Sequence, residues 1–328
     1  MRRRVILFLM NGQVKIICAV FALVLFIVPQ IAFALQPDVL QSVVRIKPDW
    51  PLLARGVDAS GAPRDPQGTG IAVFPGGYIA TNVHVLGQAK NVEVLTEDGR
   101  QFAGKIVGRD HATDIALLKI DADLPVLATA SDPKLAEPVC AIGNQFGLGL
   151  SVTCGVVSAI GRSGVGFNPV EDFIQTDASV NPGGSGGALI DRHDHLVGMV
   201  SAIFTKQSDA DIGINFAVSV PLLMRVVEDL KTYGHVKRAI AGFKVNNAME
   251  KHAGNRLGAL VESVDVNGPA FVAGLRAGDT LASINGKPLK SLASLEAMMF
   301  MFRPDESITL QVWRGAEQHT VTLMLGGS

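Results

Sequence analysis

The chain has 328 residues, with 29 Lys and Arg against 30 Asp and Glu, and 48% of its residues are apolar. At roughly 150 residues per domain, this length predicts about two domains. Three cysteines are too few for a disulfide framework, and a net charge of −1 argues against nucleic acid as a partner, because such binding requires a basic surface.

The first 34 residues have the pattern of an export leader. Arginines at the start are followed by an uninterrupted apolar run of 13 residues, from Ile16 to Val28, and then by Ala32-Phe33-Ala34. The run is short for a membrane span and typical of a signal peptide, and the small residues at its end match a cleavage site. Residues 1–34 therefore predict either a signal peptide or an uncleaved membrane anchor, with the remainder in the periplasm or otherwise outside the cytoplasm.

Short β-branched runs separated by glycine or polar turns extend from residue 68 to residue 220. Such runs without intervening helices predict an antiparallel all-β sandwich or barrel. Cys140 and Cys154 lie on two of these runs, and we expect two buried free thiols, with a disulfide across a hairpin as the alternative. Residues 47–66 contain four prolines and are expected to form a surface loop.

Helical spacing appears only after these strands. Residues 221–230 begin with a proline and repeat apolar residues at helical intervals, and Gly234 is a suitable C-cap. Residues 238–328 then form a second unit, with a helix at 291–302 and strands at 241–246, 257–266, 307–314 and 318–325.

Three short patterns carry chemistry, in the order histidine, aspartate, serine. His84 ends the strand in TNVHV, Asp114 enters a buried strand in DHATDIALLKI, and Ser185 lies among four glycines in NPGGSGG. A serine hydroxyl becomes a nucleophile when a histidine takes its proton and an acid orients that histidine. Asp110 competes for the role of the acid. Each pattern alone also fits an ordinary structural residue or turn. Because the three residues are separated by 30 and 71 positions, they can act together only if the fold brings them into contact.

The chain also contains the stretches AIGNQFGLGLSVTCGVVSAIGRSG, FIQTDASVNPGGSGGALI and GINFAV. Taken in sequence order, these stretches and the histidine and aspartate patterns resemble the motifs of the HtrA/Deg family of trypsin-like serine proteases. The resemblance implies a mainly β fold, with two six-stranded barrels and an active site between them. It assigns His84 as general base, Asp114 as its orienting acid and Ser185 as nucleophile. The N–H groups of Gly183 and Ser185, with Gly184 as a further candidate, would form the oxyanion hole.

The chain departs from the family pattern near the serine. Gly184 replaces a usual asparagine, Ala188 and Gln145 replace usual prolines, and Ser219 interrupts a usual FAIP-like run. The resemblance implies that the specificity pocket is lined by Ile212, Gly213, Ile214, Asn215 and Phe216. This segment is largely apolar and contains no acid, which favours a small or medium aliphatic residue before the cleaved bond.

The second unit resembles the PDZ domain of the same family through GPAFVAGLRAGDTLASINGKPL. PDZ domains add a C-terminal peptide as a strand and hold its carboxylate with backbone N–H groups. The resemblance implies that this site contains Ile240, Ala241, Gly242 and Phe243. We therefore expect a leader at 1–34, a protease domain at 35–235 and a PDZ domain at 236–328.

The sequence predicts an exported, ATP-independent serine endopeptidase that cleaves unfolded or damaged proteins and is regulated by C-terminal peptides at its PDZ domain. Alternatives are a proteolytically idle holding chaperone or PDZ scaffold, and a membrane-anchored regulatory protease of a stress-signalling substrate. The resemblance implies a homotrimer, and inner-membrane association follows if the leader is retained. No cofactor or metal is expected, because His193 and His195 lie in a pattern typical of a hairpin turn and His111 in a surface loop.

Overall fold

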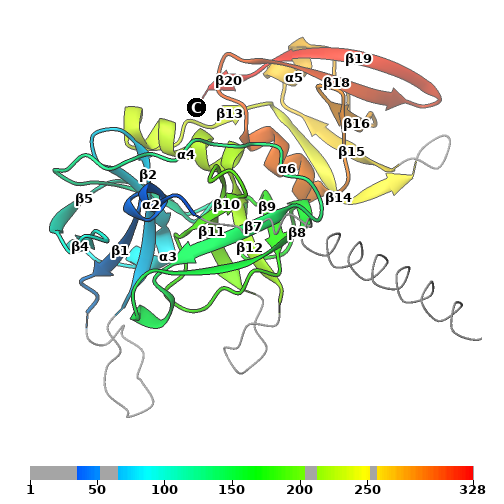
Figure 1. Ribbon diagram of the computed structural model, residues 1–328. Coiled ribbons are helices and arrows are strands. Elements are labelled where there is room, and N and C mark those ends of the chain that lie inside the picture. Colours follow the sequence, from blue (N-terminus) through cyan, green and yellow to red (C-terminus); the bar gives the residue numbers. More distant parts are fainter. Residues whose placement is uncertain (1–34, 52–65, 204–212, 252–256, 328) are drawn as a thin grey trace, which may run out of the picture. The chain divides into compact units, whose positions relative to one another are not determined.

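The computed structural model describes residues 35–51, 66–203, 213–251 and 257–327 (Figure 1). Two closed antiparallel barrels and a further sheet follow one another along this part of the chain, so the antiparallel β pattern takes the barrel form. The leader lies outside the described residues, and its interpretation stays a prediction. Within the described ranges, no helix is long and apolar enough to cross a membrane.

The first barrel has the strand order β1-β2-β3-β6-β5-β4. Its core is aliphatic, and Ile46, Ile79 and Leu118 are fully buried. The short helices α2 (Pro37–Gln41) and α3 (Val83–Leu86) lie before β1 and after β3. The strands are β1 (Val43–Pro48), β2 (Gly68–Phe74), β3 (Tyr78–Asn82), β4 (Val92–Leu95), β5 (Gln101–Asp110) and β6 (Ile115–Lys119).

The proline-rich loop begins later than predicted. Lys47 and Pro48 are the last residues of β1, because they pair with Glu93 and Val92 of β4. The extended φ of proline is compatible with the end of a strand, where its missing N–H removes only one ladder bond. Residues 52–65 of the predicted loop lie outside the described residues.

The second barrel has the order β10-β11-β12-β9-β8-β7. The segment between β9 and β10, residues 177–187, carries Ser185 and is called the Ser185 loop below. A 3-10 turn, η2 (Gln145–Gly147), follows β7. The strands are β7 (Pro138–Gly143), β8 (Ser151–Arg162), β9 (Phe173–Thr176), β10 (Ala188–Asp191), β11 (Leu196–Ile203) and β12 (Asn215–Ser219).

Cys140 and Cys154 form a disulfide, so the expectation of two free thiols was wrong. The two residues are directly paired in the antiparallel register of β7 and β8, with Cα atoms 4.0 Å apart. Their separation of 14 residues does not reveal this register. The disulfide is compatible with an oxidising compartment outside the cytoplasm.

The predicted helix after the second barrel is α4 (Val220–Tyr233). The Ser219 hydroxyl caps it by accepting a bond from Leu222 N at 3.4 Å, and Pro221 lies in the first turn, where no N–H partner is needed. Gly234 ends the helix with φ 75°, as expected for a left-handed C-cap.

The unit after α4 is the predicted small β domain, with a sheet in the order β14-β15-β16-β18-β19. Its predicted helix is α6 (Leu292–Phe300), which begins with a capping box at Ser291 and Ser294. The remaining elements are β13 (Ala239–Ile240), β14 (Phe243–Lys251), β15 (Leu257–Val264), α5 (Pro269–Val272), β16 (Thr280–Ile284), β17 (Lys287–Pro288), β18 (Ser307–Arg314), β19 (Glu317–Met324) and β20 (Gly326–Gly327).

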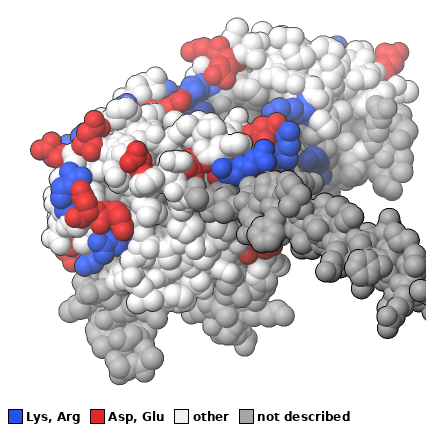
Figure 2. Space-filling view, viewed as in Figure 1, with Lys and Arg blue, Asp and Glu red and all other residues white. Residues whose placement is uncertain are grey.

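Basic and acidic side chains are intermixed on the face shown in Figure 2, with wide uncharged areas between them. One ion pair in the C-terminal unit is partly buried: Asp279 is 1% exposed, and both its oxygens accept bonds from Arg314, at 2.7 and 2.8 Å. Burial alone would raise the pKa of Asp279, but the Arg314 bonds and the Arg276 N–H outweigh it and hold that pKa below its ordinary value.

Candidate active site

His84 and Asp114 lie side by side at the edge of the first barrel. Nδ1 of His84 is 2.6 Å from Oδ2 of Asp114, and the His84 backbone N–H donates to Oδ1 of the same carboxylate at 2.9 Å. The His84 side chain is 50% exposed, whereas Asp114 is 14% exposed. One carboxylate therefore holds both the ring and the backbone of His84, and the half-exposed ring keeps Nε2 outside this contact.

The competing acid, Asp110, has different partners. It accepts bonds from the N–H and hydroxyl of Thr113, at 3.2 and 2.7 Å, and from Arg238 at 2.6 Å. The bonds from Thr113 close the turn between β5 and β6, at the end of which Asp114 adopts φ 58°. Asp110 thus supports the turn that presents Asp114 and does not contact His84.

Ser201, on β11 of the second barrel, connects the two barrels beside the serine. Nδ2 of Asn82 donates both to the Ser201 hydroxyl and to the carbonyl of Asp114, each at 3.1 Å. The Ser185 hydroxyl donates to the Ser201 carbonyl at 3.4 Å, which is a long and weak bond. Hydrogen bonds through Asn82 and Ser201 therefore link the Asp114 segment to Ser185, so the three candidate residues lie at one junction between the barrels.

The Ser185 loop presents two unengaged N–H groups. Within the described ranges, neither Gly183 N nor Ser185 N donates a hydrogen bond, whereas Gly184 N donates to Asn181 O at 2.9 Å. Gly183 has φ 92°, in the region that glycine readily adopts. The geometry thus differs from the expectation for Gly184, whose N–H is engaged inside the loop.

The segment after β7 braces the Ser185 loop. Phe146 N donates to Pro182 O at 2.7 Å, and the buried Gln145 accepts a bond from Asn181 Nδ2 at 2.7 Å. Nε2 of Gln145 also reaches Ser179 O at 3.4 Å. Gln145, which stands where the family usually has proline, therefore supplies side-chain bonds that a proline cannot make.

Sequence analysis missed one residue at this junction, Thr69 on β2. Its hydroxyl donates to Gly183 O at 2.7 Å, across 114 residues of sequence. The available signal was its position between Gly68 and Gly70, where added Cβ atoms would approach Val85 and Ile79 within 3 Å. Such glycines indicate close packing around the threonine but do not identify its partner.

The predicted specificity segment lies at the start of β12. Ile212 is outside the described residues, Gly213 and Ile214 precede the strand, and Asn215 and Phe216 are buried within it. Nδ2 of Asn215 donates to Ala178 O at 3.0 Å, which joins this segment to the Ser185 loop. The described part of the segment therefore contacts the Ser185 loop at Ala178.

The predicted peptide site contains an exposed apolar side chain and a tight turn. Ile240 is 42% exposed, and Gly242 has φ 75°. The carbonyls of Ala241 and Gly242 accept bonds from Ala270 N and Asp265 N, both at 2.9 Å. Phe243 begins β14 and packs against the core of this unit, so the four residues form a corner that is hydrogen-bonded to the rest of the unit.

His111, His193 and His195 do not belong to these sites. His193 and His195 belong to the turn between β10 and β11, as predicted, and His111 is exposed. Across the described part of the chain, no group of three His, Cys, Asp or Glu side chains is arranged to hold a metal ion.

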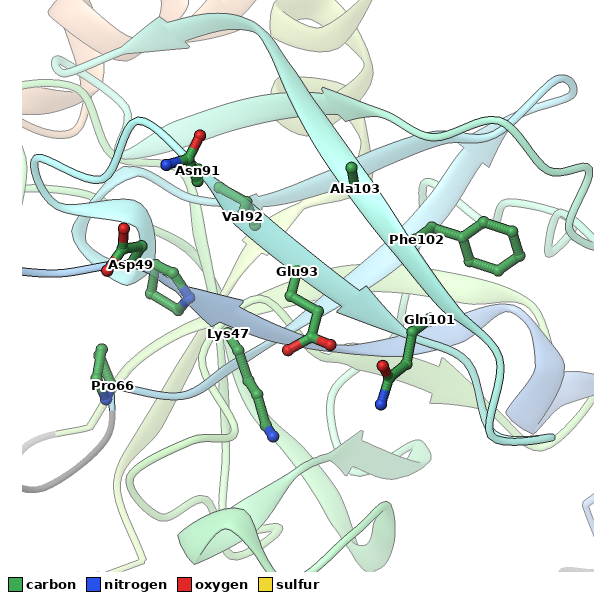
Figure 3. A pocket seen from close by; sticks show the side chains of 10 residues that line it. Lys47, Asp49, Pro66, Asn91, Val92, Glu93, Gln101, Phe102 and Ala103 are labelled. Carbon is green, nitrogen blue, oxygen red and sulfur yellow. The ribbon is translucent and has the colours of Figure 1, made fainter.

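A hollow of about 580 Å³ lies on the first barrel but shares no residue with the His84, Asp114 and Ser185 junction. Figure 3 shows Lys47 of β1, Glu93 of β4 and Gln101 of β5 projecting on one side of it. Basic and acidic residues both line the hollow, and it is open to solvent. We therefore do not assign the reaction to it, despite its volume.

Comparison with known proteins agrees with this geometry. Residues 68–199 match the trypsin-like peptidase domain family, and residues 210–325 match the PDZ domain family. The solved HtrA-type protease AlgW with tripeptide has a TM-score of 0.72 and 31% identity, covering 92% of this chain and 98% of that one. The serine endoprotease from Yersinia pestis has a TM-score of 0.61 and 32% identity, covering 89% and 96%.

Curated relatives include the periplasmic serine endoprotease DegP of Salmonella typhimurium, 39% identical over 258 residues, and the periplasmic pH-dependent serine endoprotease DegQ of Escherichia coli, 36% identical over 281 residues. These alignments cover 76% and 83% of this chain. The chain spans 54% of the length of that DegP and 62% of DegQ.

Two barrels with a His-Asp pair on one and a glycine-flanked serine on the other, followed by a PDZ domain, define a trypsin-like peptidase fold with a peptide-binding module. Within that class, the match to AlgW, at 31% identity over 98% of the AlgW chain, shows which family this chain belongs to. The chain belongs to the HtrA/Deg family.

Proposed function

We propose that the protein is a serine endopeptidase in which Ser185 is the nucleophile, His84 the general base and Asp114 the acid that orients His84. The observation that carries this proposal is the double contact of Asp114 with the ring and the backbone of His84. This arrangement fixes the tautomer of the imidazole and stabilises its positive charge when it takes the serine proton.

In the proposed reaction, Ser185 Oγ leaves the weak bond to Ser201 O and attacks the substrate carbonyl carbon while Nε2 of His84 takes its proton. The tetrahedral oxyanion is held by the N–H groups of Gly183 and Ser185, which have no partner among the described residues. His84 then protonates the leaving amine, and an acyl-enzyme forms. Water, deprotonated by His84, releases the acid product and regenerates Ser185.

The proposed substrates are unfolded or damaged proteins, cleaved after small or medium aliphatic residues. The apolar sequence of residues 212–216 supports this preference, because it contains no acid that would select Lys or Arg, and its Asn215 contacts the Ser185 loop. The names of the DegP and DegQ relatives support an endoprotease acting in the periplasm.

The proposed regulator is a C-terminal peptide that pairs with the corner formed by Ile240, Ala241, Gly242 and Phe243. The exposed side chain of Ile240 supports this role. We place the boundary between the protease and PDZ domains at residues 235 and 236, after the C-cap of α4. The proposed assembly is a homotrimer, which light scattering of the purified protein tests.

The decisive experiment compares casein hydrolysis by the wild type and by Ser185→Ala. The proposal predicts hydrolysis by the wild type alone and a faster rate when an apolar C-terminal peptide is added. Equal rates for both proteins would exclude the protease function and favour the holding chaperone or scaffold. Cleavage restricted to one substrate, together with an intact Met1 in the mature protein, would favour the anchored regulatory protease.

A further inference from the structure

Thr69 lies on the first barrel but makes most of its polar contacts with the second. The residue is fully buried, its N–H donates to Ser185 O at 2.9 Å, and its hydroxyl donates to Gly183 O at 2.7 Å. The same hydroxyl accepts a bond from Asn144 N at 2.9 Å. The Thr69 hydroxyl thus donates its one hydrogen to the Ser185 loop and accepts a bond from Asn144, which lies on a separate segment of the second barrel.

These contacts bracket the peptide group that carries the N–H of Ser185. The carbonyl of Gly183 belongs to the preceding peptide group and the carbonyl of Ser185 to the following one, and Thr69 holds both. Peptide groups are planar, so fixing the two neighbours leaves the Ser185 N–H little rotational freedom. Thr69 therefore orients one of the two proposed oxyanion donors.

The contact with Asn144 extends this control to the other donor. Asn144 immediately precedes the turn in which Phe146 N donates to Pro182 O at 2.7 Å. In a trans peptide the C=O and N–H point in opposite directions, so the bond to Pro182 O sets the direction of the Gly183 N–H. The hydroxyl of Thr69 thus connects the segments that orient both donors.

Close packing around Thr69 depends on glycines. A Cβ on Gly186 would lie 2.0 Å from Thr69 O, and a Cβ on Gly143 would lie 3.0 Å from Gly184 Cα and 3.3 Å from the Thr69 hydroxyl. In addition, the hydroxyl of Thr81 donates to Thr69 O at 2.7 Å. The backbone carbonyl of Thr69 is therefore held from the first barrel, while its N–H and hydroxyl contact the second.

The geometry points to Thr69 as a positioning residue for the oxyanion hole, which acts on the reaction only through Gly183, Ser185 and Asn144. This inference rests on the proposed serine endopeptidase function. Oxyanion donors contribute to the rate only if they are oriented before the charge develops. Loss of the hydroxyl would leave Gly183 O and Asn144 N without partners and would let the loop adopt other orientations.

The test uses Thr69→Ala, which removes the hydroxyl, and Thr69→Ser, which keeps it. Thr96→Ala is the matched control, because Thr96 is also buried in the first barrel and its hydroxyl donates to Asp98 and Arg100 O in the turn after β4. For each variant, kcat and KM are measured on a peptide substrate. The urea midpoint and the inhibition constant of a peptide boronic acid, whose adduct with serine is tetrahedral, are measured in parallel.

We expect Thr69→Ala to lower kcat at least about tenfold with little change in KM, below the roughly 100–1,000-fold cost of removing a donor itself. The boronic acid inhibition constant should rise by the same factor, because the inhibitor resembles the transition state. Thr69→Ser should retain wild-type kcat. Thr96→Ala should lower the urea midpoint without changing kcat or the inhibition constant.

Wild-type kcat and inhibition constant in Thr69→Ala would overturn the role of Thr69 while leaving the protease function intact. A Thr69→Ser variant as slow as Thr69→Ala would also overturn it, because the hydroxyl would then not be the cause. If Thr69→Ala does not fold, Thr69→Val preserves the side-chain volume and allows the same comparison. Hydrolysis by the wild type no faster than by Ser185→Ala would overturn both proposals.

Discussion

Asp114 holds His84 at two points: Oδ2 lies 2.6 Å from Nδ1 of the ring, and Oδ1 accepts the His84 backbone N–H at 2.9 Å. Asp114→Asn should lower kcat by about 10⁴-fold, because an amide at this position stabilises the wrong imidazole tautomer and loses the negative charge. Turnover of a peptide substrate at saturating concentration measures this loss.

Asp110→Asn is the matched control for Asp114→Asn. Asp110 precedes Asp114 by one turn and contacts Thr113 and Arg238 rather than His84. This variant should lose less than about tenfold in kcat, because the effect acts only through the turn. A loss in Asp110→Asn as large as that in Asp114→Asn would contradict the assignment of the orienting acid.

Gly186→Ala should disrupt the contact between the barrels. Gly186 has φ 84°, and a Cβ there would lie 2.0 Å from Thr69 O and 2.5 Å from the Thr81 hydroxyl. The control is Gly76→Ala, at φ 81° with nothing within 4 Å of the added Cβ. Gly76→Ala should cost about 1–2 kcal/mol of unfolding free energy from backbone strain alone. Gly186→Ala should cost more and abolish hydrolysis, as urea unfolding and a peptide assay would reveal; equal costs would contradict the close approach.

Removal of the disulfide should destabilise the second barrel. Cys140 and Cys154 are separated by 14 residues, and a closed loop of about this length contributes about 3 kcal/mol to the free energy of unfolding. The double variant Cys140→Ala and Cys154→Ala should therefore unfold at lower urea concentration than the oxidised wild type. Alkylation of the denatured protein before and after reduction, followed by mass spectrometry, checks the pairing. Labelling of both cysteines without reductant would contradict it.

We expect the Asp279–Arg314 ion pair to contribute less to the free energy of unfolding in acid. The pKa of Asp279 is lower in the folded chain than in the unfolded one, so its stabilisation is present above the unfolded value of about 4 and is lost as the pH falls through the folded pKa. Asp279→Asn should cost about 1–3 kcal/mol at pH 7, as expected for losing hydrogen bonds to a charged partner in a partly buried pair, and less toward pH 3. Urea unfolding of both proteins across this pH range measures the difference; a constant difference would contradict the role of ionisation.

Local sequence patterns predicted most of the fold. Strand runs between residues 68 and 220, the proline-initiated helix ending at Gly234 and the strands after residue 238 all appear in the structure. These features are local, because alternation, capping residues and glycine turns act over a few residues. The prediction was wrong where pairing was required: Lys47 and Pro48 join β1 through β4, and the two cysteines face each other in one register.

The sequence by itself determined most of the element types, the resemblance to the family, and the candidates His84, Ser185 and an aspartate at 110 or 114, since these are marked by their immediate neighbours. Only the tertiary structure decided that His84 contacts Asp114 rather than Asp110, that Gly184 N is engaged within its loop, and that Thr69 reaches Gly183 across 114 residues. The physical reason is that these contacts join segments on different strands or barrels. Their partners depend on strand register and on the close approach that glycines permit, and neither is recorded in the local pattern of residues.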